Sequence, residues 1–212
     1  MSLEREWWLR MAGVLVRPRD VFLALRVTER EDVDARQEPI LLLTILAGIA
    51  GVLLTTAWNG MLDPGAAGGV TLDWLTFAVL TFVAGALEGA VAYFVVGGAL
   101  YLGARGMGSL ADARVARHVL AFSCVPLALS LFVTLPVGLA AFGGDVFRTG
   151  GRDSGVGGDV YLAWRLVFVA WSLGLLFYGI GTVYGWTWGR AAGAVALLAV
   201  FLVGFAALTT VL

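Results

Sequence analysis

Residues 74–102 read WLTFAVLTFVAGALEGAVAYFVVGGALYL, an apolar run of 29 residues whose one formal charge, Glu88, lies at its middle. A helix of this length, rising about 1.5 Å per residue, would extend roughly 43 Å. The hydrocarbon core of a bilayer is only about 30 Å thick. The run can therefore cross a membrane by tilting or by extending past one face, and it predicts a membrane-spanning helix.

The composition extends this prediction to the whole chain. Of the 212 residues, 60% are hydrophobic and only 14% are charged, and the mean hydropathy is +0.90. These values are typical of a polytopic membrane protein. The net charge of −1 indicates that nucleic acid is not a partner.

Four further apolar runs predict four more spans, and the predicted fold class is an all-α bundle of five transmembrane helices over residues 39–212. The expected spans are residues 40–58, 74–102, 118–142, 161–183 and 190–212. The third contains Pro126 and Pro136. A proline removes a backbone hydrogen bond and usually bends a membrane helix, so we expect this span to be bent or interrupted.

Residues 1–38 are predicted to form cytoplasmic amphipathic helices followed by a charged linker. Apolar side chains recur at helical spacing over residues 3–16, and Trp7 and Trp8 favour the headgroup level of a membrane. A second helix is predicted after Arg17. Its apolar stripe is formed by Val21, Phe22 and Leu25. We expect both helices to lie in the membrane interface; the alternative is a soluble helical arm packed on the membrane domain.

The distribution of arginine predicts the orientation. Seven arginines precede the first span, three lie in the second loop and one lies in the short fourth turn. Only three lie on the opposite side of the predicted spans. The positive-inside rule therefore predicts a cell-membrane protein with a cytoplasmic N-terminus and an external C-terminus.

Small residues at four-residue spacing predict close helix packing, because lipid removes the hydrophobic reason for helices to associate. Gly85 and Gly89 show this spacing in the second span, and Gly181 and Gly185 show it in the fourth. A homodimer seam is one version of this packing. The alternative is that glycine, with 29 copies in this chain, is simply abundant.

Glu88 is the one carboxylate deep within a predicted span. A charge at this depth costs roughly 3 kcal/mol on insertion scales, so Glu88 should be protonated, paired or facing a polar cavity. It would serve as a proton or cation site, or as a polar contact to a partner helix. The alternative is a neutral carboxyl that bonds to a neighbouring helix. Its candidate donors are Ser123, Ser130, Thr134, Ser172, Tyr178 and Arg165.

No residue set in the sequence predicts catalysis, a metal site or a cofactor. His118, the only histidine, lies at the cytoplasmic entrance to the third span, where an interfacial hydrogen bond is favoured over a proton relay. Asp145, Asp153 and Asp159 lack the spacing of an EF-hand loop. Hydrolase, P-loop and zinc motifs are absent. We therefore expect a protein that is not an enzyme.

The stretch LGARGMGSLADARVARHVLAFSCVPLAL, residues 102–129, resembles the central sequence of the Yip family, integral membrane proteins named for interaction with Ypt/Rab GTPases. A Gly-rich turn with Ser109 precedes a helix and an aromatic–Ser–x–x–Pro element at residues 122–126. The flanking stretches VRPRDVFLAL and WGRAAGAVAL also resemble that family. The resemblance implies five spans and a non-enzymatic role, and the composition fits a prokaryotic member.

The sequence is compatible with three functions. The leading hypothesis is a structural or adaptor protein in the lipid bilayer. Its partners, other membrane proteins or a second copy, would meet the N-terminal helices or the second cytoplasmic turn. The candidate residues of that turn are Arg105, Ser109, Arg114 and Arg117. The runner-up is a small transporter or channel in which Glu88 faces a polar cavity, and the third is lipid handling or membrane shaping.

Overall fold

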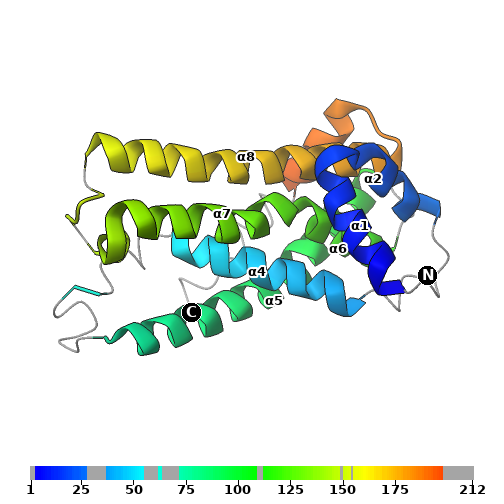
Figure 1. Cartoon of the computed structure of the whole chain (residues 1–212). Coiled ribbons are helices and arrows are strands. Elements are labelled where there is room, and N and C mark those ends of the chain that lie inside the picture. Colours follow the sequence, from blue (N-terminus) through cyan, green and yellow to red (C-terminus); the bar gives the residue numbers. More distant parts are fainter. Residues whose placement is uncertain are drawn as a thin grey trace, which may run out of the picture. The chain divides into compact units, whose positions relative to one another are not determined.

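The computed structural model describes residues 3–27, 37–54, 62–63, 72–108, 112–148, 150–153 and 155–197. Within these ranges every regular element is a helix (Figure 1). The elements are α1 (Leu3–Val16), α2 (Pro18–Val27), α4 (Gln37–Leu54), α5 (Trp74–Gly106), α6 (Ala113–Ser123), α7 (Val125–Phe142), the 3-10 helix η1 (Gly143–Phe147) and α8 (Val156–Tyr184). Residues 188–197 are also helical.

Three helical stretches are long and apolar enough to cross a membrane, judged by length and composition. They are Trp74–Gly106, Ala113–Phe147 and Val156–Tyr184, and α4 adds the shorter apolar stretch Ile40–Leu54. These four overlap the first four predicted spans, although residues 55–58 of the first lie outside the described residues. The helix at residues 188–197 coincides with the start of the fifth. The rest of that span and the predicted linker at residues 28–36 lie outside the described residues.

The third predicted span is interrupted beside its first proline. Helix α6 ends at Ser123 and α7 begins at Val125. Between them the backbone N–H of Cys124 donates to the carbonyl oxygens of both Leu120 and Ala121, each at 3.1 Å. Pro126 has no N–H with which to continue the helical ladder. Helix α7 runs on through Pro136.

The chain divides into two compact units. Unit 1 comprises Met1–Thr44, Val91–Val125 and Ser172–Leu212, and unit 2 comprises Ile45–Ala90 and Pro126–Trp171. The helices α4, α5 and α8 each contribute residues to both units.

The core of unit 1 contains the apolar stripe of α2. Phe22 is fully buried, and a Cβ built on Gly179 of α8 would lie 2.8 Å from its ring. Val21 and Leu25 are also buried, and α2 contacts α1 and α6. This face of α2 therefore packs against protein, as in the alternative of a helical arm on the membrane domain.

An aromatic cluster lies at the start of α5 in unit 2. The ring centroids of Phe77 and Phe147 are 4.9 Å apart, and the Trp74 ring stands edge-on to both at 6.1 and 6.0 Å. Such tilted geometries are favoured by aromatic quadrupoles. A Cβ built on Gly144 would lie 2.7 Å from the indole of Trp74, so a glycine at this position lets η1 approach α5.

Asp73 determines where α5 begins. Its carboxylate Oδ1 accepts a 2.6 Å hydrogen bond from the backbone N–H of Thr76, and its carbonyl accepts one from Phe77 at 2.9 Å. This is the geometry of a helix N-cap, which satisfies an otherwise unpaired backbone donor. The hydrogen bonds from Thr76 hold the pKa of the Asp73 carboxyl below its ordinary value of 3.8.

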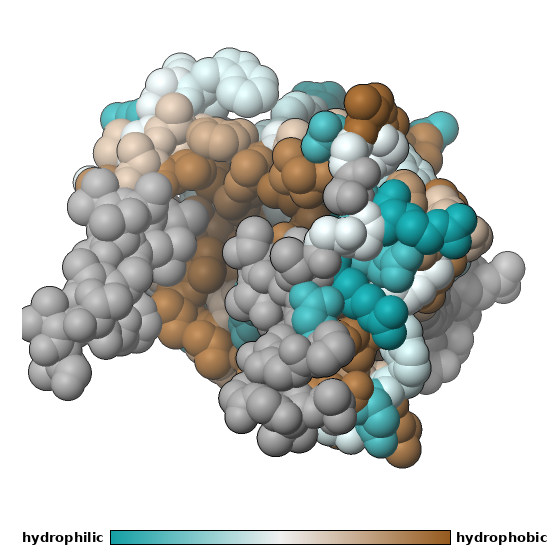
Figure 2. All heavy atoms as spheres, turned by 90° about the vertical axis from the view of Figure 1, so that its left-hand side faces the viewer, coloured by the Kyte–Doolittle hydropathy of each residue, from teal (hydrophilic) through white to brown (hydrophobic). Residues whose placement is uncertain are grey.

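Large apolar side chains cover much of the exposed surface. Figure 2 shows brown hydrophobic residues over wide areas, with teal hydrophilic residues in separate groups. On α5, Leu75, Phe82 and Leu87 are each more than 60% exposed. Apolar exposure of this extent is unfavourable in water and expected at a lipid-facing surface.

Candidate functional site

Helices α4 and α5 approach closely within unit 2 because glycines line both sides of the contact. A Cβ built on Gly48 would lie 2.7 Å from the Cα of Gly89 and would also clash with the carbonyl oxygen of Gly85. A Cβ built on Gly85 would lie 2.8 Å from the backbone nitrogen of Ile49. The pair Gly85 and Gly89, which the sequence predicts to pack, thus lies against α4. Close backbone approach of this kind is a principal source of helix association in lipid.

Glu88 lies beside this contact, on the exposed side of α5. Its Oε1 would be 3.6 Å from a Cβ built on Gly51, so the carboxyl reaches the edge of α4. It forms no hydrogen bond or ion pair with another residue that the structure describes. Several of its predicted donors are used elsewhere. Backbone carbonyls accept bonds from the side chains of Ser123, Ser130, Thr134 and Arg165.

A second polar cluster in unit 2 is built around Arg165. The guanidinium Nη2 donates a 2.6 Å hydrogen bond to the carbonyl oxygen of Leu53, in the last turn of α4. The guanidinium also lies 5.5 Å from the centroid of the Tyr161 ring, one turn earlier on α8. The Tyr161 hydroxyl donates to the carbonyl oxygen of Thr134 at 2.9 Å. Two side chains of α8 thus satisfy backbone carbonyls of two other helices.

A small cavity adjoins this cluster. Its volume is about 10 Å³, and its lining includes the polar side chains of Ser130, Thr134, Tyr161 and Arg165. That volume corresponds to about one water molecule. The cluster therefore ties the helices of unit 2 together and leaves little room for a solute.

Sequence reasoning did not single out Arg165 as a site residue. The sequence indicated it only as one of six candidate hydrogen-bond donors to Glu88. The available signal was an arginine within the apolar run of α8, at i+4 from Tyr161. Roughly 14 Å separate Arg165 from the start of that helix. An ionisable side chain at such a depth needs a partner, although the sequence does not show which one.

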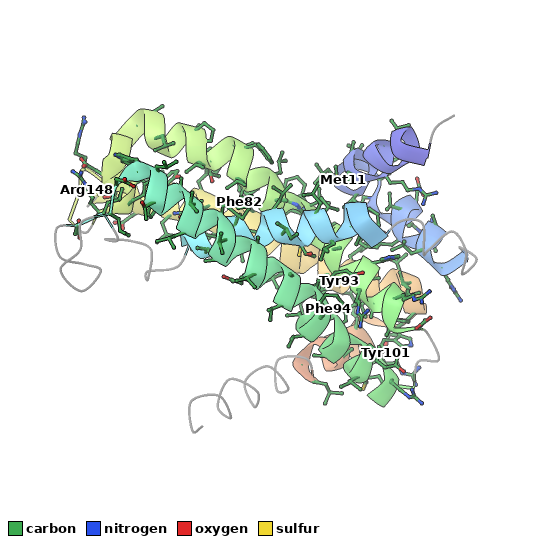
Figure 3. The ribbon with its side chains drawn as sticks, turned by 90° about the horizontal axis from the view of Figure 1, so that it is seen from below. Met11, Phe82, Tyr93, Phe94, Tyr101 and Arg148 are labelled. Carbon is green, nitrogen blue, oxygen red and sulfur yellow. The ribbon has the colours of Figure 1, made fainter. Side chains whose placement is uncertain are left out.

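Arg117 of α6 packs against α5 within unit 1. Its guanidinium carbon lies 5.7 Å from the ring centroid of Tyr93 and 5.2 Å from that of Phe94, within the range of cation–π attraction. A Cβ built on Gly97 would lie 2.6 Å from the Arg117 side chain, so the glycine makes room for the arginine stem. Figure 3 shows both aromatic residues on α5, with Tyr101 further along the helix.

The other residues of the predicted partner surface have different environments. Arg105 is exposed, and its Nη1 donates a 2.6 Å hydrogen bond to the Tyr101 hydroxyl. Arg114 is half-buried. Ser109 lies outside the described residues. His118, the candidate interfacial residue, is buried at 2% exposure in the core of unit 1.

Gly181 and Gly185 of the fourth span do not form a contact like that of Gly85. Gly185 lies just beyond the end of α8 with a φ of 65°, a conformation that favours glycine. The next residue, Trp186, donates its backbone N–H to the carbonyl oxygen of Gly181 at 2.9 Å. This 6→1 bond is that of a Schellman C-cap, so the two glycines terminate the helix.

A comparison with models of known families shows to which family the chain belongs. The model of the Yip1 domain matches residues 12–208, nearly the whole sequence. The chain belongs to the Yip1 domain family. No curated protein and no solved structure gave a match.

The match to the Yip1 domain and the long apolar helices together indicate that this chain is embedded in a membrane. Glu88 differs in its surroundings from two arginines of the described helices. Arg165 and Arg117 are held by contacts inside their own units. Glu88 instead presents a carboxyl at the exposed edge of the α4–α5 contact.

Proposed function

We propose that this Yip1-domain protein is a non-enzymatic structural or adaptor component of the cell membrane. It would cross the bilayer five times, with the N-terminus in the cytoplasm and the C-terminus outside. The observation that carries the proposal is the exposed carboxyl of Glu88 at the middle of an apolar helix.

The surroundings of Glu88 favour a partner helix over an internal solute path. Its neighbour Leu87 is 62% exposed, and Val91, one turn further on, is 52% exposed. A carboxyl that faces lipid is costly, and this cost is relieved when a second helix supplies a hydrogen-bond donor. Polar contacts between membrane helices contribute about 0.6–2 kcal/mol each. The exposed side of α5 is therefore the proposed docking surface for a membrane partner or a second copy of the chain.

Site-specific photo-crosslinking in the native membrane tests this proposal. A photoreactive residue at position 87 should give a discrete crosslinked product of defined mass. The same residue at Leu173, which is 50% exposed on α8, is the matched control. Glu88→Leu should abolish the product and Glu88→Gln should retain it, because glutamine keeps hydrogen-bonding capacity. Equal crosslinking at positions 87 and 173 would count against a specific surface on α5.

The transporter alternative gives a different outcome with the same variants. In proteoliposomes, proton-linked flux that is lost in Glu88→Gln would support Glu88 as a proton site. Wild-type flux in that variant would remove Glu88 from any transport mechanism.

A further inference from the structure

A pocket of about 190 Å³ lies in unit 1, where α8 ends. Its wall is mainly aromatic, with Gly181 and Thr182 adding a small-residue side. The aromatic lining residues are Phe177, Tyr178, Trp186 and Trp188. A cavity of about 150 Å³ holds a benzene molecule, so this pocket can hold a segment of a hydrocarbon chain.

The pocket lies at a junction between two helices. Helix α8 ends at Tyr184, Gly185 forms the left-handed cap, and the next helix begins at position 188. Trp186 lies within this short connection, and Trp188 is the first residue of the next helix. Tryptophan at the end of an apolar helix favours the headgroup level of a bilayer, so we expect the pocket to open where lipid headgroups and acyl chains meet.

A cationic side chain lies beside the connection that carries Trp186. The Arg26 Nη1 would lie 3.5 Å from a Cβ built on Gly185, which precedes the lining residue Trp186. Arg26 is exposed and has no hydrogen bond or ion pair with another described residue. Arg190 is also exposed and precedes Ala191, which lines the pocket too. The aromatic pocket and the Arg26 guanidinium thus adjoin the same short connection, residues 185–187.

We propose that this site binds one anionic phospholipid, with an acyl chain in the aromatic pocket and the phosphate on Arg26. A planar guanidinium binds phosphate through two parallel hydrogen bonds. The charge of Arg26 disfavours a cationic ligand, and the apolar interior of the pocket disfavours a free anion. This lipid site goes beyond the adaptor function and does not depend on it.

Native mass spectrometry of the full chain in detergent tests the proposal, with phosphatidylglycerol and phosphatidylcholine of identical acyl chains as probes. One phosphatidylglycerol should bind per chain, with about tenfold or greater preference over phosphatidylcholine. Arg26→Gln should weaken phosphatidylglycerol binding by about tenfold in Kd. Arg19→Gln, which changes another exposed arginine of α2, should leave it intact. Thr182→Phe should weaken binding of both lipids by filling the pocket.

Several results would overturn the lipid site. Equal retention of both lipids would show that the site does not select an anionic lipid, and unchanged phosphatidylglycerol binding in Arg26→Gln would remove Arg26 as the phosphate ligand. Displacement of the lipid by millimolar inorganic phosphate would identify a free-anion site. A dimer that forms in place of the lipid complex would identify a protein contact. If Thr182→Phe does not fold, Arg26→Gln still decides the question, because Arg26 is exposed and outside the core of unit 1.

Discussion

Arg165 of α8 donates a hydrogen bond to the backbone carbonyl oxygen of Leu53, 112 positions earlier in the chain, at 2.6 Å. Leu53 lies in the last turn of α4, where helical carbonyls lack intrahelical partners. In lipid an unsatisfied carbonyl costs several kcal/mol. The arginine therefore acts as a helix cap supplied by a different helix.

Removal of this cap should destabilise the protein. Arg165→Met keeps the length of the side chain but leaves the Leu53 carbonyl without its donor, so we expect a loss of about 1.5–3 kcal/mol in unfolding free energy. Unfolding in mild detergent, monitored by circular dichroism, measures the effect. Arg152→Met, at an exposed arginine, should be neutral. Equal stability of the two variants would show that the cap contributes little.

The α4–α5 contact predicts opposite effects for two glycine substitutions on one helix. Gly85→Ala places a Cβ within 3 Å of Ile49 and should cost about 1–3 kcal/mol. Gly98→Ala meets nothing within 4 Å and should be neutral or stabilising, since alanine is the better helix former. Thermal unfolding of both variants beside the wild type provides the comparison. A destabilised Gly98→Ala with an unaffected Gly85→Ala would contradict this account of the contact.

Asp73 should make the start of α5 sensitive to acid. Because hydrogen bonds from Thr76 lower the folded-state pKa, the charged cap stabilises the protein at neutral pH. This contribution begins to fall as the pH approaches the ordinary value of 3.8 and is lost as it falls through the lowered folded pKa. The difference in Tm between wild type and Asp73→Ala should therefore shrink in acid. Asp73→Asn, which keeps a capping oxygen without a charge, should show less of this pH dependence.

Arg117 should behave as a packing residue and not as a free surface charge. Arg117→Met retains an apolar stem at Gly97 but loses the attraction to Tyr93 and Phe94, so we expect destabilisation of about 0.5–2 kcal/mol. Arg19→Met, at an exposed position, is the control. Denaturant titration of both variants measures the difference. If Arg117→Met is as stable as the control, Arg117 would again be a candidate residue of the partner surface.

Features that depend on residues close together in the chain were predictable from the sequence. The apolar runs placed α5, α8 and the interrupted third span, because the cost of leaving backbone groups unpaired in lipid makes helices the only choice for such runs. The interruption next to Pro126 follows from the missing N–H of proline. The ends of the helices were less accurate. For example, α5 continues to Gly106, past the predicted end at residue 102, and includes Arg105, which bonds to Tyr101.

Hydropathy alone determined that this chain is an all-helical membrane protein, because burial of apolar side chains in lipid is a local, additive property. Only the tertiary structure decided which helix faces meet. It placed Gly48 against Gly85, Phe22 against Gly179 and Arg165 against Leu53. Each of these pairs joins residues far apart in the chain, and each depends on shape and hydrogen-bond complementarity between whole helices. The spacing of Gly85 and Gly89 along one helix predicts a close contact, but it does not show which helix lies on the other side.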